Sequence, residues 1–263
     1  MRVAMFSDIH GNWTAFETAL ADLAVLGGAD QIWFLGDYAA FGPRPAECVA
    51  KILAMVAEAD ADEARKGTVR AISGNTDRYL VTGARRGGPP ATDAETLAGA
   101  IAMLRPLFDG LMWGTERLPF PEYDFLAKLP GEIGWRPPGF GPVLAYHGTP
   151  GDDEGMLTPD MTDATAADTL LDREGVLGVG GHIHIQFDRL LPGYGWRIVN
   201  IGSVGMSFDR PGYAQWGLFT FADGALTVNL RAVPYDVDAV LADARAAGHF
   251  APDWLEHRLR VGR

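Results

Sequence analysis

The 263-residue chain contains a single cysteine, Cys48. Without a second thiol it cannot form an internal disulfide, so nothing points to an oxidising compartment. Cys48 stands among apolar residues of an expected helix, where a buried structural thiol is a better interpretation than a reactive one. We therefore do not expect disulfide or redox chemistry to carry the function.

Positive charge is also scarce, because 22 lysines and arginines face 34 aspartates and glutamates, for a net charge of −12. An acidic surface excludes broad electrostatic binding to nucleic acid or to an anionic membrane. Long hydrophobic runs are missing as well, and the short apolar N-terminal stretch is broken by Asp8 and His10. No segment fits a signal peptide or a membrane span, so we expect a cytoplasmic protein without membrane or nucleic-acid partners.

Short apolar segments alternate with helical patterns in the first third of the chain. Strands are expected at residues 2–7, 31–35 and 68–73, with apolar residues at helical spacing between them. Such alternation indicates a parallel or mixed sheet with helices packed on its faces, the α/β class. We predict one domain over residues 1–263.

The rest of the chain changes character. Residues 93–128 are helical in pattern and contain no clear strand, which predicts a helical insertion at about residues 85–130. Further strands are expected at residues 143–146, 176–180, 185–190, 196–201, 215–221 and 225–233. Turn residues between several of them indicate an antiparallel meander, and a helix over 237–247 is expected near the end.

Polar side chains follow each of the first three strands directly. The segments SDIHGN, LGDY and SGNTDR place Asp8 and His10, Asp37, and Asn75 and Asp77 at these positions. Ligand sites in α/β proteins form where loops leave the carboxyl ends of strands. Any one of these motifs alone is more often an ordinary turn, but three in succession favour a site.

Three more candidate ligands come from the second half. His147 follows a strand in AYHGTP, and GGHIHIQF holds His182 and His184 two residues apart. An isolated pair of this kind is more often the polar face of a strand, where alternate side chains point the same way. Two carboxylates, four imidazoles and one amide suit Mn, Fe, Zn, Co or Ni. Seven ligands exceed the needs of one ion and favour a two-metal site with a bridging carboxylate.

The order D-x-H, G-D, G-N-x-D, H-G and G-H-x-H resembles that of the calcineurin-like metallophosphoesterases, most closely the compact bacterial and archaeal members. This resemblance implies a four-layer α/β/β/α sandwich of two mixed sheets. It also implies two divalent metal ions with a bridging Asp37. The ligands would be Asp8, His10, Asp37 and His184 for one ion, and Asp37, Asn75, His147 and His182 for the other.

The resemblance further implies hydrolysis of a phosphate ester or anhydride by a metal-bridging hydroxide. Asp37, Asn75 and Asp77 are the expected catalytic residues, with Asp77 fixing a ligand loop or orienting a histidine. Asn12 and Arg78 are the candidates for substrate binding. Helix capping is an equally good interpretation for Asn12, and a solvent-facing position is at least as good for Arg78. Two alternatives stay open, a phosphomonoesterase and a non-catalytic protein-binding scaffold with this fold.

One position departs from the family pattern. Many members carry a histidine where this chain has Thr76, and that histidine is thought to protonate the leaving group. A threonine hydroxyl is too weak an acid for this role. We therefore expect a small phosphorylated substrate whose leaving group departs without a proton, such as an aryl phosphodiester or a nucleotide anhydride. His249 or His257 could replace the acid, but solvated tail residues are the better interpretation for both.

Overall fold

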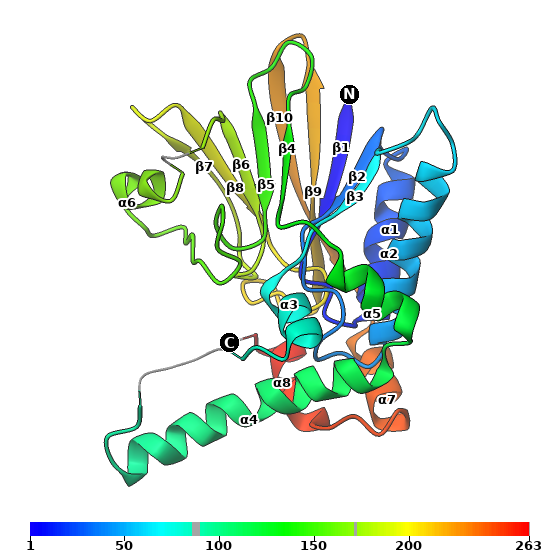
Figure 1. Cartoon of the computed structure of the whole chain (residues 1–263), viewed down its shortest axis with the longest axis vertical. Coiled ribbons are helices and arrows are strands. Elements are labelled where there is room, and N and C mark those ends of the chain that lie inside the picture. Colours follow the sequence, from blue (N-terminus) through cyan, green and yellow to red (C-terminus); the bar gives the residue numbers. More distant parts are fainter. Residues whose placement is uncertain (86–89, 171–172, 263) are drawn as a thin grey trace.

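Two five-stranded mixed sheets form the centre of the computed structural model, which describes residues 1–85, 90–170 and 173–262 (Figure 1). The first sheet has the order β10-β9-β1-β2-β3. Its strands are β1 (Arg2–Phe6), β2 (Gln31–Phe34), β3 (Val69–Ala71), β9 (Tyr213–Ala222) and β10 (Ala225–Pro234). The central pairs β1–β2 and β2–β3 are parallel, whereas β9 is antiparallel to β1 and β10.

The second sheet has the order β4-β5-β6-β8-β7. Its strands are β4 (Glu132–Trp135), β5 (Val143–Tyr146), β6 (Leu177–Gly180), β7 (Gln186–Leu191) and β8 (Trp196–Ile201). Here β5, β6 and β8 are parallel, and β4 and β7 are antiparallel edge strands. The inner parallel strands of both sheets end on the same side of the molecule, which brings their following loops together.

Alternating side chains along the strands build the layers. On β1, Val3 and Met5 pack between the sheets with Val143 and Ala145 of β5, while Phe6 packs against the outer helices. This follows from the two-residue period of a strand, which sends neighbouring side chains to opposite faces. Because both faces are apolar, the central strands are buried on both sides.

Helices cover the outer face of each sheet. Helices α1 (Trp13–Val25), α2 (Pro45–Asp60), α7 (Val237–Ala246) and α8 (Pro252–Arg260) pack on the first sheet's side, and α6 (Asp163–Asp168) packs on the second. The predicted α/β/β/α sandwich is therefore confirmed. Cys48 is buried in α2, and burial raises the pKa of its thiol, as expected for a structural residue. No helix in the described part of the chain is long and apolar enough to cross a membrane.

Three helices stand between β3 and β4: α3 (Asn75–Thr82), α4 (Ala94–Arg117) and α5 (Phe120–Ala127). They account for the helical pattern expected over 93–128; residues 86–89 of the expected insertion lie outside the described residues. The C-terminal half of α4 is anchored by buried Leu111 and by Trp113, whose indole N–H donates to the Gly42 carbonyl at 2.9 Å. Its N-terminal half extends away from the sheets (Figure 1).

Two sequence predictions need correction. The expected antiparallel meander is wrong. Among the strands expected there, the described residues pair only β7 with β8 and β9 with β10 as antiparallel hairpins, whereas β5, β6 and β8 are parallel, and β8 and β9 belong to different sheets. Strand β4 was not expected. It is a four-residue edge strand with one fully buried side chain, Ile133, and the glycine Gly134, so its local pattern is too weak to identify it.

Candidate metal centre

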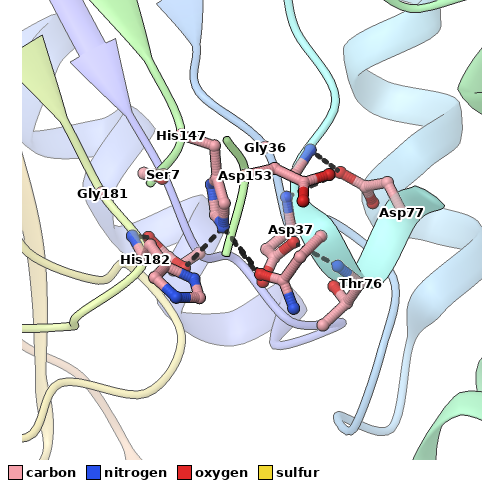
Figure 2. A network of polar contacts seen from close by, with 12 residues as sticks. Ser7, Gly36, Asp37, Thr76, Asp77, His147, Asp153, Gly181 and His182 are labelled. Atoms are coloured by element: carbon pink, nitrogen blue, oxygen red, sulfur yellow. Dashed lines mark hydrogen bonds and ion pairs between the residues drawn. The ribbon is translucent and has the colours of Figure 1, made fainter. Parts of the chain in front are cut away.

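All seven candidate ligands lie in the loops at the carboxyl ends of the strands. Asp8 and His10 follow β1, Asp37 follows β2, Asn75 opens α3, His147 follows β5, and His182 and His184 lie between β6 and β7. Six of them are at most 8% exposed, and His182 is half-buried. His147 and His182 lie on one side of Asp37, with Thr76 and Asp77 on the other (Figure 2). The fold therefore brings together residues that are up to 176 positions apart, from Asp8 to His184.

The backbone is strained at five of these ligands. Asp8, His10, Asp37, His182 and His184 have φ angles of 55°, 50°, 61°, 67° and 58°, in the left-handed region that non-glycine residues rarely adopt. Each such residue costs about 1–3 kcal/mol, and such strain gathers at functional sites. Hydrogen bonds between the loops hold it in place, for example from the His10 N–H to the Asp37 carbonyl at 3.0 Å.

The glycines of the G-D and G-N motifs allow these loops to pack directly on one another. A Cβ at Gly36 would lie 2.5 Å from the Gly74 nitrogen, and one at Gly74 would lie 2.2 Å from Oδ1 of Asp37. Any side chain at Gly74 would therefore displace the Asp37 carboxylate.

The first donor group contains Asp8, His10 and His184. Nε2 of His184 lies 3.1 Å from Oδ1 of Asp8 and 3.1 Å from Nε2 of His10. Nδ1 of His184 donates to the Met206 carbonyl at 2.6 Å, which leaves the Nε2 lone pair directed at the group. Oδ1 of Asp8 is buried and has no hydrogen bond among the described residues. A cation here would satisfy that oxygen together with the two imidazoles.

The second donor group contains Asp8, Asp37 and His147. Nε2 of His147 lies 3.4 Å from Oδ2 of Asp37, 4.0 Å from Oδ1 of Asp8 and 3.1 Å from Oδ1 of Asn75. Nδ1 of His147 donates to the Leu35 carbonyl at 2.7 Å and so leaves Nε2 free for a metal. The same backbone-anchored arrangement thus recurs in both groups.

The two carboxylates connect the groups. Oδ1 of Asp37 accepts the Thr76 N–H at 2.9 Å, while Oδ2 faces both His147 and, at 3.7 Å, Nε2 of His10. Asp8 is shared as well, since its Oδ1 belongs to both groups. The distances thus fit the expected bridging position of Asp37 and place Asp8 beside it.

His182 stands slightly apart and belongs to neither donor group. Its ring meets that of His147 edge to face, with centroids 5.1 Å apart, and its backbone N–H donates to Oδ2 of Asp8 at 2.9 Å. The position beside His147 fits the expectation that His182 and His184 bind different metals. The ring nitrogens of His182 do not lie within 4.8 Å of all the ligand atoms of either group.

The electrostatics favour an ionised carboxylate at Asp8 and neutral imidazoles at His10 and His182. Burial opposes the charge of Asp8, but His184 and His147 outweigh it and hold its pKa at about 2. Burial lowers the pKa of His10 and of His182 to about 4. For His147, burial is outweighed by Asp37 and Asp8, which raise the pKa to about 10. Metals bind ionised carboxylates and neutral imidazoles, so cation binding would release a proton from His147.

Asp77 acts on the Asp37 loop rather than on a histidine. Its Oδ2 accepts the N–H groups of Asp37 at 2.7 Å and Gly74 at 3.0 Å, and its Oδ1 accepts that of Tyr38 at 3.0 Å. The side chain is fully buried, and burial together with the charge of Asp37 raises its pKa to about 7. Asp77 is therefore a positioning residue for the loop that carries Asp37.

The two candidate substrate-binding residues have protein partners. Asn12 caps α1 by accepting the Ala15 N–H at 3.1 Å, and its amide donates to the Gly205 carbonyl at 2.8 Å. Arg78 forms 2.7 Å hydrogen bonds to both oxygens of Asp153. Both side chains are thus engaged in holding loops around the site.

The prediction of a solvated tail is wrong for His249. This side chain is 6% exposed, its Nε2 donates to the Phe41 carbonyl at 2.5 Å, and its ring lies 4.9 Å from that of Trp113. His257 is exposed, as expected. Neither histidine lines the cavity at the donor groups, so neither replaces the acid absent at Thr76.

A cavity of about 170 Å³ opens onto the donor groups. Asp37, Asn75 and His184 form part of its floor with the Thr76 side chain, whose hydroxyl is buried without a hydrogen bond among the described residues. Its other walls are mainly apolar and come from residues for which no motif gave a signal: Phe41, Tyr79, Leu107, Phe108, Leu111, Met206, Phe208, Trp254 and Arg258.

Residues 1–223 match a family model described as the calcineurin-like phosphoesterase superfamily domain. The chain is 28% identical over 276 residues to an uncharacterized protein of Methanocaldococcus jannaschii, MJ0912, with 99% of this chain and 98% of that protein covered. Its fold is similar to that of a metallophosphoesterase from Sphaerobacter thermophilus, with a TM-score of 0.72, 23% identity, and coverage of 100% of this chain and 99% of that one. Hypothetical protein PH1004 from Pyrococcus horikoshii OT3 is also similar, with a TM-score of 0.77, 20% identity and the same coverage.

Proposed function

The chain belongs to the calcineurin-like phosphoesterase superfamily, and on that premise we propose that it is a hydrolase that uses two divalent metal ions to cleave a phosphate ester or anhydride. The observation that carries this proposal is the pair of buried donor groups that share Asp8, whose Oδ1 has no hydrogen bond within the described chain. The residues fit the cofactor, because carboxylates and backbone-anchored imidazoles are ligands of Mn, Fe, Zn, Co and Ni.

One ion would be held by Asp8, His10 and His184 and the other by His147 and Asn75, with Asp37 shared between the two and His182 beside the second. When bound, two such ions lower the pKa of a shared water and offset the charge of a phosphate. The protein's own part is to fix the ligands. Asp77 and the Thr76 N–H hold the Asp37 carboxylate, and backbone carbonyls orient His147 and His184.

The cavity provides no evident acid for a poor leaving group. Apart from the candidate ligands, its titratable side chains in the described chain are Tyr79 and Arg258, and burial and Glu154 raise the pKa of Tyr79 well above its ordinary value. A useful general acid has a pKa near the operating pH, and the Thr76 hydroxyl is no better. The proposal therefore favours phosphodiesters or nucleotide anhydrides with good leaving groups over general phosphomonoesters.

Metal content and hydrolysis, measured on the same preparation, test the proposal. The protein with added Mn²⁺ should bind two equivalents and hydrolyse bis(p-nitrophenyl) phosphate faster than p-nitrophenyl phosphate or an alkyl diester. Asp37→Asn should lose both properties, whereas Asp223→Asn, an exposed change in the β9–β10 turn, should keep them. A wild-type protein that binds no metal and cleaves neither esters nor dinucleoside polyphosphates would instead support the scaffold alternative.

A further inference from the structure

Two helices that carry none of the motifs line the cavity at the donor groups. Helix α4 contributes Leu107 and Phe108, and helix α8 contributes Trp254 and Arg258. Arg258 lies 74 residues beyond His184, the last candidate ligand. Helix α8 therefore places a cationic side chain in the lining of the cavity that opens onto the candidate metal centre.

Arg258 differs from other partly buried arginines of this acidic chain. Arg78, Arg197 and Arg231 each pair with an aspartate at 2.6–2.9 Å. Around Arg258, by contrast, the described residues place no carboxylate within ion-pair distance, 4.0 Å. Its guanidinium lies over the ring of Trp254, 5.5 Å from the centroid, and its one hydrogen bond to a described residue runs from Nη1 to the Gly262 carbonyl at 3.3 Å.

Most donors of this guanidinium are therefore available to a ligand. A guanidinium carries five N–H donors in a planar fork that matches two phosphate oxygens, and the described residues satisfy only one of the nitrogens of Arg258. Burial also lowers the pKa of Arg258, because a half-buried cation without a counterion is poorly solvated. A bound anion would remove that cost. The buried Thr76 hydroxyl, also without a partner in the described chain, faces the same cavity.

The apolar part of this lining is suited to a flat apolar group. Phe108 and Leu107 of α4 stand with Trp254 and Phe208 around the cavity, and aromatic side chains favour stacked or edge-to-face contact with another ring. The cavity thus combines anion-binding groups at its floor and on Arg258 with an aromatic side wall.

From this arrangement we infer that Arg258 binds a phosphate oxygen of the substrate and that the wall formed by α4 and α8 accepts an aromatic group attached to that phosphate. The inference rests on the proposed function and deepens it by naming the substrate class, an aromatic or nucleobase-containing phosphate compound. Arg258 stabilises the phosphate charge from the lining of the cavity, and the aromatic wall selects the substituent.

Two non-hydrolysable probes separate these roles. Phenylphosphonate and methylphosphonate share an anionic head and differ by a ring, and calorimetry on the Mn²⁺-loaded protein gives their affinities. The wild type should bind phenylphosphonate more tightly. Arg258→Gln should weaken both probes by about tenfold, the cost of one charge-assisted hydrogen bond, whereas Phe108→Ala should weaken phenylphosphonate alone.

Arg260→Gln is the matched control, because Arg260 is an exposed arginine on the same helix that pairs with Glu256 and Asp238 outside the cavity. It should leave both affinities unchanged, and no variant should alter Mn²⁺ affinity. If Arg258→Gln fails to fold, Arg258→Lys, which keeps the charge but not the fork, should still bind both probes more weakly than the wild type.

Wild-type affinity for both probes in Arg258→Gln would overturn the role of Arg258, and equal affinity of the wild type for the two probes would overturn the aromatic wall. Turnover of bis(p-nitrophenyl) phosphate is followed in parallel. Absence of wild-type turnover counts against the proposed function. If the wild type turns the substrate over and Arg258→Gln shows the same turnover and the same probe affinities, the result counts against this inference alone.

Discussion

Gly74→Ala is expected to disable the metal centre without altering any ligand. Gly74 lies between β3 and α3 with extended backbone, φ −98° and ψ 178°, so alanine meets no conformational penalty there. The added Cβ would lie 2.2 Å from Oδ1 and 2.7 Å from the nitrogen of Asp37, whereas ordinary contacts begin near 3.4 Å. The Asp37 carboxylate must therefore move by roughly 1 Å, a displacement that costs about 10²-fold in catalysis at a preorganised site.

The size of the effect follows from the same contact. Overpacking at a buried position costs about 1–3 kcal/mol of stability, and a displaced ligand lowers metal affinity by about 10- to 100-fold. Gly99→Ala is the matched control, because a Cβ at Gly99 of α4 meets no atom within 4 Å, so this variant should gain up to about 1 kcal/mol. Urea unfolding and Mn²⁺ calorimetry measure both effects. Wild-type Mn²⁺ affinity in Gly74→Ala would refute the role assigned to Asp37.

Three further predictions follow from individual side chains. Calorimetry should find one Mn²⁺ equivalent lost in His182→Gln and one in His184→Gln, with His257→Gln as the exposed control. Binding of two Mn²⁺ equivalents by either ligand variant would contradict the assignment of these histidines to the two metals. Thr76→His should raise the rate on an alkyl phosphodiester relative to an aryl one, and an unchanged rate ratio would argue against the missing acid. Burial lowers the pKa of His249, so below about pH 6.5 this imidazole takes up a proton more readily in the unfolded chain than in the folded protein. Stability should therefore fall as the pH drops below that value, and urea unfolding at about pH 8 and about pH 5 should show a smaller loss for His249→Gln than for the wild type; an equal loss would exclude this contribution.

The strands and the ligand loops could be predicted because their signals are local. Strand β1 is a continuous apolar run from Val3 to Phe6, and Asp8 and His10 follow within four residues of its end. The parallel order of the central strands then requires these loops to meet at one edge. Residue type and position along the chain were therefore enough to anticipate which side chains would gather.

Other features depend on contacts that no local pattern encodes. From the sequence, His249 is expected to be an exposed residue of the C-terminal tail. In the fold its ring packs against Trp113 and its Nε2 donates to the Phe41 carbonyl. Arg258 belongs to a polar helix, and only tertiary packing shows that it faces the cavity without a carboxylate partner among the described residues. Strand β4 is defined by its pairing with β5 rather than by its own residues.

The central claim is that two metal ions share the carboxylates of Asp8 and Asp37, which follow β1 and β2. A crystal structure of the Mn²⁺-loaded protein, with an anomalous difference map recorded at the manganese edge, tests it most directly. Two peaks are expected, both beside Oδ2 of Asp37 and Oδ1 of Asp8, one toward His184 and the other toward His147. A single peak, or none at these atoms, would contradict it.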